Sequence, residues 1–231
     1  YKDEIIVIDC GVAFPDEEMY GVDLVIPDIT FLLENKEKVK GIFLTHGHED
    51  HIGSLPYILK QLNVPLYGTK LTLGIVQTKL EEHNIHHDCQ LISVEAGEVV
   101  KLSNIYVEFI RNTHSIADSC SLAIHTPLGI IFHTGDFKID YTPIDGKVMD
   151  LERISALGKK GILLLMADST NVERRGHSIS EKTIGDTFEK VFAKAEGRII
   201  VATFASNIHR MQQIVDSSIK YGRKVAFMGR S

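Results

Sequence analysis

Short runs of β-branched and other apolar residues recur along most of the chain and predict β-strands. They occupy residues 4–8, 39–44, 105–110, 121–125, 129–133 and 162–166. A helical period of about 3.6 residues marks three other segments, namely residues 53–62, 70–83 and, most strongly, 181–195. Because these helices are spaced among the strands, the pattern predicts an α/β fold.

Turn and capping residues sharpen this picture at two places. Pro127-Leu128-Gly129 stands between two apolar runs and predicts a tight hairpin, so mixed rather than purely parallel sheets are expected. Ser178-Ile179-Ser180-Glu181 has the capping-box pattern that opens a helix.

The rhythm changes from residue 178 onward. Helix 181–195, strand 198–204, helix 207–221 and strand 224–228 follow one another, which predicts a βαβ unit. We therefore expect one domain over residues 1–177 and a second over residues 178–231. The chain starts without Met inside an apparent strand and stops just after another. We accordingly expect truncation at both ends, with the first domain lacking its N-terminal strand and the second incomplete.

Composition excludes several classes of protein. The 231 residues contain no apolar run near the roughly 20 that a membrane span needs. Cys10, Cys89 and Cys120 form no CxxC pair, so neither a disulfide framework nor a zinc ribbon is expected, and a cytoplasmic location fits best.

The charge is divided unevenly between the two expected domains. The formal net charge of −6 argues against a generally basic nucleic-acid coat. Residues 178–231, however, hold nine Lys and Arg against five Asp and Glu, a balance of +4 that leaves −10 for residues 1–177. The two parts are therefore expected to do different jobs.

The densest group of metal-binding residue types follows the apolar strand 39–44. Three imidazoles and two carboxylates fall within six positions, at His46, His48, Glu49, Asp50 and His51. Gly47 lets the backbone bend so that the first two histidines can face one cation, while Asp50 and His51 point toward a second. The spacing predicts a two-metal site.

Three more candidates lie at strand ends. His114 follows strand 105–110, and Asp136 follows strand 129–133 after Gly135, which permits a sharp turn. A carboxylate can bridge two cations, so both residues are expected to complete the ligand set. Asp9 closes the first strand and is either a hydrogen-bond acceptor supporting the ligand loop or a plain turn residue.

The order of these residues resembles the first four motifs of the metallo-β-lactamase superfamily. More narrowly, four stretches are similar to the bacterial ribonuclease J family, in the β-CASP nuclease branch. They are Ile8-Asp9-Cys10-Gly11, Leu44-Thr45-His46-Gly47-His48-Glu49-Asp50-His51-Ile52-Gly53, Ala167-Asp168-Ser169-Thr170-Asn171 and Phe204-Ala205-Ser206-Asn207-Ile208-His209-Arg210. The resemblance spans essentially the whole chain.

This resemblance implies a fold and an activity. It implies an αββα sandwich with mixed sheets, closed by an acidic motif at Asp168, followed by the start of an α/β β-CASP domain. The implied function is a metal-dependent ribonuclease that hydrolyses RNA phosphodiesters, as an endonuclease and a 5′-to-3′ exonuclease, in RNA processing and decay. A later motif of the family supplies a further histidine ligand and part of a phosphate pocket. An inactive fragment is therefore one expectation for this chain.

The ligands divide into two groups under this interpretation. His46, His48 and His114 are assigned to one divalent cation, Asp50 and His51 to the other, and Asp136 to both as the bridge. Asp50, His51 and Asp136 are the expected catalytic residues. Zinc suits the imidazole-rich group, and manganese can suit the more carboxylate-rich one.

RNA is the expected partner, and Ser206, Asn207 and Arg210 are its candidate contacts. Ser206 is expected to cap a helix whose free N–H groups receive a phosphate. The alternative is that Ser206 is only a cap and Arg210 a surface charge. In the full-length protein, a homo-oligomer or a paralogous subunit is expected, with no membrane association.

Two other functions stay open from the sequence. One is a hydrolase of the same superfamily that acts on a thioester, lactone or lactam, against which the basic second segment argues. The other is a non-catalytic RNA-binding partner subunit, which would usually have lost ligands, whereas all six are present here.

Overall fold

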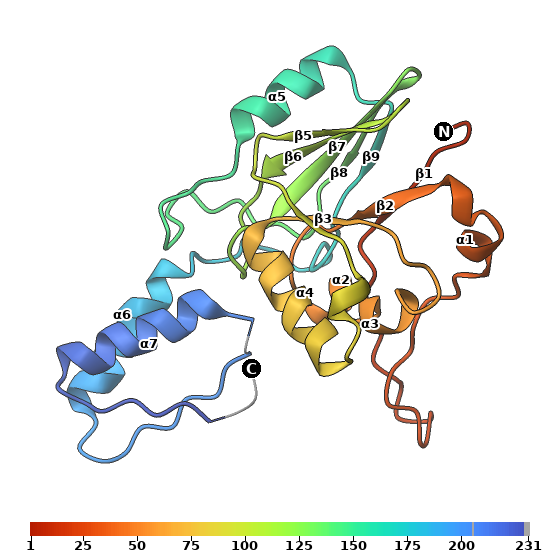
Figure 1. Ribbon diagram of the computed structural model, residues 1–231. Coiled ribbons are helices and arrows are strands. Elements are labelled where there is room, and N and C mark those ends of the chain that lie inside the picture. The colour runs from red at the N-terminus through yellow and green to blue at the C-terminus, as the bar shows by residue number, and fades with distance from the viewer. Residues whose placement is uncertain (205, 229–231) are drawn as a thin grey trace.

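The structure is a computed structural model that describes residues 1–204 and 206–228. Two sheets lie face to face with helices on both outer sides (Figure 1). The first sheet is parallel, in the order β1 (Ile5–Ile8), β2 (Val39–Phe43), β3 (Leu66–Gly68) and β4 (Leu91–Ser93). The second contains, in order, β5 (Val99–Lys101), β6 (Tyr106–Arg111), β7 (Cys120–Thr126), β8 (Gly129–His133) and β9 (Leu164–Met166).

The second sheet confirms the predicted hairpin and the mixed pairing. β5 to β8 pair antiparallel, with Thr126 opposite Gly129 at the turn between β7 and β8, whereas β8 and β9 pair parallel. The helices are α1 (Thr30–Glu34), α2 (Glu49–Ile52), α3 (Leu55–Ile58), α4 (Lys70–Glu82), α5 (Leu151–Lys160), α6 (Lys182–Lys194) and α7 (Ile208–Lys220). Two short 3-10 turns, Lys36–Lys38 and His86–Asp88, lie between them.

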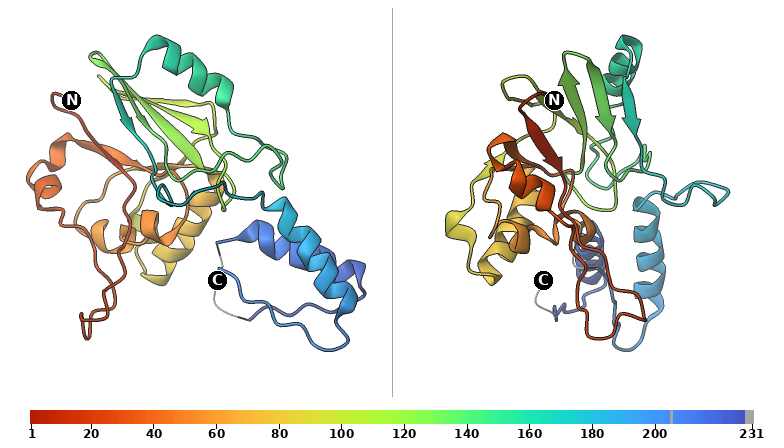
Figure 2. Two further views of the ribbon diagram at one scale, coloured as in Figure 1. Left: turned by 180° about the vertical axis from the view of Figure 1, so that it is seen from behind. Right: turned by 90° about the vertical axis from the view of Figure 1, so that its right-hand side faces the viewer.

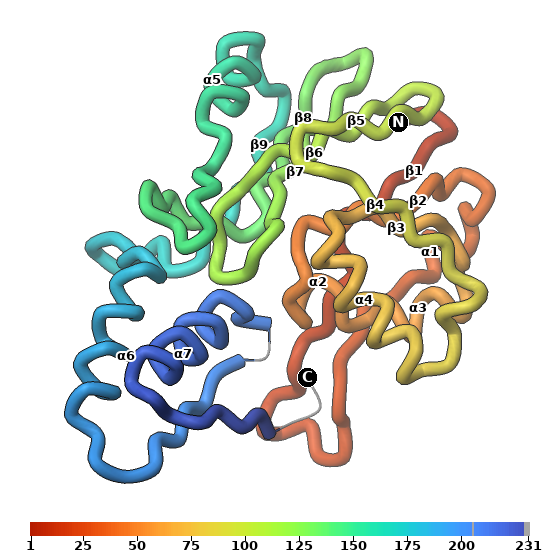
Figure 3. Tube along the Cα trace, turned by 60° about the vertical axis from the view of Figure 1, so that its left-hand side comes forward, coloured from red at the N-terminus to blue at the C-terminus, as the bar shows by residue number. Residues whose placement is uncertain are grey.

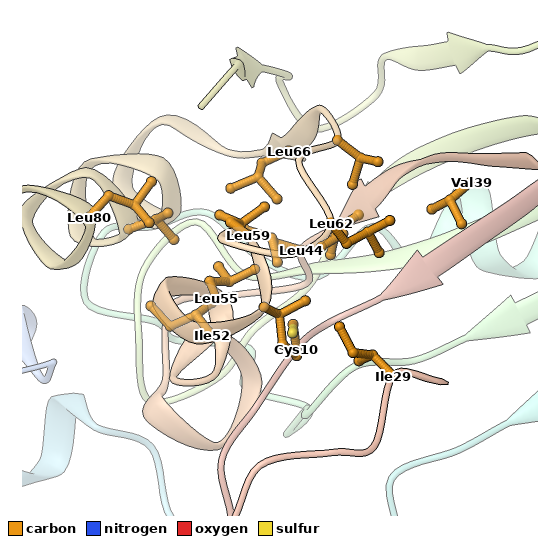
Figure 4. Close-up of a cluster of buried hydrophobic side chains, with 14 of the residues drawn as sticks. Cys10, Ile29, Val39, Leu44, Ile52, Leu55, Leu59, Leu62, Leu66 and Leu80 are labelled. Carbon is orange, nitrogen blue, oxygen red and sulfur yellow. The ribbon is translucent and has the colours of Figure 1, made fainter. Parts of the chain in front are cut away.

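Three hydrophobic clusters separate the four layers. The largest joins the first sheet to α3 and α4, and Figure 4 shows leucines such as Leu55, Leu62, Leu66 and Leu80 meeting there. A second fills the space between the two sheets, and a third lies between the second sheet and α5, around Leu157. The result is the αββα sandwich that the sequence predicted.

Strand periodicity explains why one strand serves two clusters. In β1, Ile5 and Val7 contact the helix-side cluster, while Ile6 and Ile8 contact the cluster between the sheets. Successive side chains of a strand point to opposite faces, so a strand buried on both faces reads as a continuous apolar run.

Two helix predictions need correction. The single helix expected over residues 53–62 is instead α3, only four residues long. Pro56 in its first turn accounts for the late start, because proline does not continue a helix from the preceding residues. After Ile58 the chain continues as turns, with Leu62 N–H donating to the Ile58 carbonyl oxygen. The capping box is wrong as well. Glu181 occupies the N-cap of α6, and its carboxylate pairs with Lys138 Nζ (3.2 Å) and Arg210 Nη2 (2.8 Å).

The segment after residue 178 forms its helices but not its expected strands. α6 and α7 run side by side apart from the sandwich (Figures 2 and 3). Gly185 in α6 allows a close approach to Gln213 in α7. Residues 198–204 and 224–228 are irregular, so the βαβ prediction is wrong for this structure. A β-strand requires a neighbouring strand to which its backbone is hydrogen-bonded. Residues 198–204 and 224–228 are not paired with each other in this way.

Within the described part of the chain, no helix is both long and apolar enough to cross a membrane.

Candidate metal centre

The loop after β2 places the first two candidate ligands. It leaves the carboxyl end of β2 and enters the one-turn helix α2, so its side chains lie at the edge of the sheet. His46 is fully buried, and its Nε2 lies 2.9 Å from His48 Nδ1. On the other side of the ring, His46 Nδ1 is 3.0 Å from Thr45 Oγ1, which fixes the orientation of the ring.

A first donor set forms where this loop meets two others. His114, from the loop after β6, brings its Nε2 to 3.2 Å from His48 Nδ1. Asp136 Oδ2, from the loop after β8, lies 3.7 Å from the same Nε2 of His114. One donor atom each from His46, His48, His114 and Asp136 lie within 4.8 Å of one another. Three imidazoles and a carboxylate make a donor set suited to zinc.

A second donor set shares Asp136 with the first. It consists of Asp50, His51 and Asp136, again with donor atoms within 4.8 Å of one another. His51 Nε2 lies 3.3 Å from Asp136 Oδ1 and 3.7 Å from Asp50 Oδ2. The two oxygens of Asp136 therefore face different sets, Oδ1 toward His51 and Oδ2 toward His114. This is the geometry of a carboxylate that can bridge two cations.

The turn that carries Asp136 is fixed by its neighbours. Gly135 has a φ of +57° and lies so close to Cys120 and Thr45 that a Cβ would be 3.0 Å from the Cys120 carbonyl oxygen. The side-chain amide of Asn112 donates to the carbonyl oxygens of Thr134 (2.9 Å) and Asp136 (3.0 Å). Asn112 and Thr45 were not predicted as site residues. Their closeness in sequence to the candidate ligands His114 and His46 was the only sequence feature that could have indicated a supporting role.

Asp9 supports the second donor set by contacting the ring nitrogen of His51 that faces away from Asp136. Its backbone is left-handed, with φ of +57°. Its carboxylate accepts from Thr45 N–H and Thr45 Oγ1, both at 2.7 Å, and contacts His51 Nδ1 at 2.7 Å. With Nδ1 engaged, the Nε2 atom of His51 is the one that faces Asp136.

Asp168 lies outside both donor sets. Its Oδ2 accepts from Phe137 N–H at 3.3 Å, its Oδ1 accepts from Thr170 N–H at 2.8 Å, and its own N–H donates to Thr134 Oγ1. It therefore connects the end of β9 to the loop that carries Asp136.

The two donor sets differ in protonation. Burial lowers the pKa values of His46 and His48, and lowers that of His114 to about 4, so all three rings are neutral near pH 7 and offer lone pairs. Burial also opposes protonation of His51, but hydrogen bonds with Asp136 and Asp9 outweigh it and raise its pKa to about 10. The same hydrogen bond from His51 lowers the pKa of Asp136 to about 2.

The residues predicted to contact RNA lie at the start of α7. Asn207, not Ser206, is the N-cap of this helix, and its Oδ1 accepts from Arg210 N–H at 3.1 Å. The cap prediction for Ser206 is therefore wrong. Arg210 pairs with Glu181. His209 and Glu181 line a cleft together with His114, so the start of α7 shares this cleft with one member of the first donor set.

Comparison with known proteins defines the class first. Residues 1–137 match the model of the metallo-β-lactamase superfamily, and the chain belongs to this superfamily. Residues 196–231 match the model described as the ribonuclease J β-CASP domain, although Ala205 and residues 229–231 within it lie outside the described residues. The superfamily and the His/Asp group together support a hydrolase that binds divalent metal.

The particular relatives are ribonuclease J proteins. The chain is 51% identical over 233 residues to ribonuclease J of Synechocystis sp., an alignment that covers 100% of this chain and 36% of the relative. Identity is 47% to ribonuclease J of Thermus thermophilus and 45% to ribonuclease J 1 of Streptococcus pyogenes, covering 100% of this chain and 42% and 41% of theirs. The chain thus spans roughly two fifths of the length of these curated relatives.

One solved structure supports the fold. A crystal structure of a protein of unknown function from Enterococcus faecalis superposes with a TM-score of 0.66 at 21% identity, covering 94% of this chain and 58% of that one.

Proposed function

We propose that this chain is the metal-binding part of a ribonuclease that hydrolyses RNA phosphodiesters, both internally and from the 5′ end, in RNA processing and decay. The observation that carries the proposal is the pair of donor sets sharing Asp136. The names of the relatives supply the substrate class.

The proposal assigns one cation to each donor set. His46, His48 and His114 hold the first, Asp50 and His51 hold the second, and Asp136 joins them. Zinc suits the first because three neutral imidazoles are a common catalytic zinc site. The second set has a higher share of carboxylate, so manganese is an acceptable occupant there.

The chain's own residues supply the geometry for hydrolysis. When bound, two divalent cations activate a water molecule and offset the negative charge that develops on the phosphodiester. Asp136 sets the separation of the two sets, and the hydrogen bonds from Asn112 fix its backbone. Asp9 keeps the Nε2 atom of His51 directed at the site. Asp168 maintains the position of the loop that carries Asp136.

The basic segment supplies RNA binding in this proposal. We assign residues 1–177 to the metallo-β-lactamase domain and residues 178–231 to the beginning of a β-CASP domain. The latter carries the +4 balance, and we assign phosphate contacts to the start of α7, at Ser206, Asn207 and Arg210. For Arg210 to bind a phosphate, it must exchange its contact with Glu181. We further propose a cytoplasmic protein that assembles with a second copy or a paralogous subunit.

The test is cleavage by a chimera in which this chain replaces the matching segment of the Synechocystis relative. We expect cleavage of a 5′-monophosphorylated RNA and no hydrolysis of a chromogenic lactam. Asp136→Asn in the same chimera should abolish cleavage and retain RNA binding, because most binding contacts go to phosphates elsewhere.

Two outcomes would replace the proposal. Lactam or thioester hydrolysis without RNA cleavage would favour a small-molecule hydrolase. A non-catalytic subunit would be favoured if the parent chimera and its Asp136→Asn variant both bind RNA and neither cleaves it.

A further inference from the structure

The helix that carries two of the three residues of the second donor set is too short to fix its own orientation. α2 spans only Glu49–Ile52, one turn, and it presents both Asp50 and His51. A single turn has little intrinsic stability, because helix nucleation costs more than one hydrogen bond returns. Contacts from outside the helix must therefore fix its direction.

The segment that follows β1 supplies these contacts through its backbone. Cys10 N–H donates to the carbonyl oxygen of His51 at 2.6 Å. In return, Ser54 N–H donates to the carbonyl oxygen of Cys10 at 3.0 Å, and Ser54 Oγ donates to that of Gly11 at 2.5 Å. The residues after β1 and the residues on both sides of the α2 C-terminus thus form one hydrogen-bonded clasp.

Gly11 makes the close approach in this clasp possible. A Cβ at this position would lie 1.6 Å from the carbonyl oxygen of Asp50 and 2.9 Å from the backbone nitrogen of His51. Both of those atoms belong to backbone, which cannot move aside without moving α2. Any larger residue at Gly11 would therefore displace the two ligands.

Ser54 is committed to the clasp rather than to a helix cap. It is fully buried and occupies the N-cap of α3, where a serine hydroxyl usually accepts a hydrogen bond from the helix. Here its hydroxyl donates backwards to Gly11, 43 positions away in sequence. Replacing this hydroxyl would leave the Gly11 carbonyl without its partner.

We propose that Gly11 and Ser54 are positioning residues for the second donor set, docking α2 so that Asp50 and His51 face Asp136. The inference rests on the two-cation site of the proposed function. The effect should fall mainly on the second cation, because Asp50 and His51 lie within α2, whereas His48 is only its N-cap. His46 lies before the helix and His114 comes from a different loop. The clasp should therefore change the affinity of the second cation far more than that of the first.

Zinc titration of the 231-residue chain by calorimetry tests this. Ser54→Ala should weaken binding of the second cation by about 10–100-fold, the range found for outer partners of metal ligands, with a much smaller effect on the first binding event. Gly11→Ala should have a larger effect in the same direction.

Two substitutions of the same kind serve as controls. Ser218→Ala removes a buried hydroxyl that donates to the Ile214 carbonyl oxygen within α7. Gly74→Ala adds a methyl group to α4 where a Cβ meets nothing within 4 Å among the described residues. Both should titrate like the unmodified chain, and circular dichroism should show that every variant retains its helices.

The result that would overturn the inference is a Ser54→Ala variant that binds the second cation as tightly as Ser218→Ala does. Equal weakening of both cations would also overturn it, because it would mean a general structural role. If Gly11→Ala does not fold, Ser54→Ala decides alone. Failure of the proposed two-cation site looks different, because the unmodified chain itself would then bind fewer than two cations.

Discussion

The two donor sets share Asp136 but are built in opposite ways. The first consists of neutral histidines, of which His46 is fully buried. The second contains Asp50, whose side chain is 60% exposed, and His51, whose pKa is raised to about 10. One set is ready for a cation at neutral pH, while the other must first release a proton.

This difference implies an order of loading. Neutral lone pairs bind a cation without rearrangement, so the first set should fill first and more tightly. A cation bound at the second set would replace the proton that the hydrogen bonds with Asp136 and Asp9 favour on His51. Two metal sites built from similar residue types can therefore differ in affinity because of the hydrogen-bond partners of their ligands. In the second set this partner is Asp9, which contacts the Nδ1 atom of His51.

The largest effect is expected from removing the histidines of the first set. His46→Ala with His48→Ala deletes two of three imidazoles, so zinc affinity there should fall well beyond the roughly 10–100-fold that outer partners are worth. Zinc content after dialysis, measured by atomic emission, is the readout. His86→Ala with His87→Ala, which changes two neighbouring histidines outside both sets, is the matched control. Equal zinc content in the two double variants would show that the first donor set does not bind zinc.

Asp136→Asn should weaken both cations rather than one. It keeps the size of the side chain but removes the charge that faces both sets, so each affinity should fall by about tenfold or more, and calorimetric titration reports both. A variant in which only one binding event weakens would mean that Asp136 belongs to one set alone.

The pH dependence of binding should separate the two sets. The pKa of His51 is raised to about 10, so its proton is bound at pH 6–9 and binding of the second cation releases it. The apparent affinity of the second cation should then rise about tenfold per pH unit across this range. The pKa of His114 is lowered to about 4, so the first affinity should stay nearly flat above about pH 6.

Parallel slopes for the two binding events would contradict this assignment. The Asp9→Asn variant tests the assignment more strictly. Loss of the Asp9 charge should lower the pKa of His51, so the affinity of the second cation should depend less steeply on pH.

That the candidate ligands lie together was predictable from sequence, because they follow strands whose order is simple. His46 to His51 come directly after β2, and the loop bearing Asp136 comes directly after β8, so apolar runs and their ends were enough to bring them together. The hairpin between β7 and β8 was equally clear, because Pro127 and Gly129 mark its turn.

Other features carry too little local signal. β3, β4 and β5 are three residues long, and α5 was missed although its own Leu157 is fully buried. The clasp between Gly11 and Ser54 depends on a hydrogen bond across 43 positions in sequence, and neither glycine nor serine as a residue type predicts such a contact. The strands expected at 198–204 and 224–228 have suitable composition, but strand formation requires a hydrogen-bonded neighbour that sequence periodicity does not supply.

Electron paramagnetic resonance of the chain loaded with manganese tests most directly the claim that two cations share Asp136. With two equivalents of manganese, we expect an exchange-coupled spectrum, because a carboxylate bridge would hold the two cations about 4 Å apart. Asp136→Asn should abolish the coupling. A spectrum at two equivalents that is only the sum of two isolated manganese ions, unchanged by Asp136→Asn, would show that the two cations do not share Asp136.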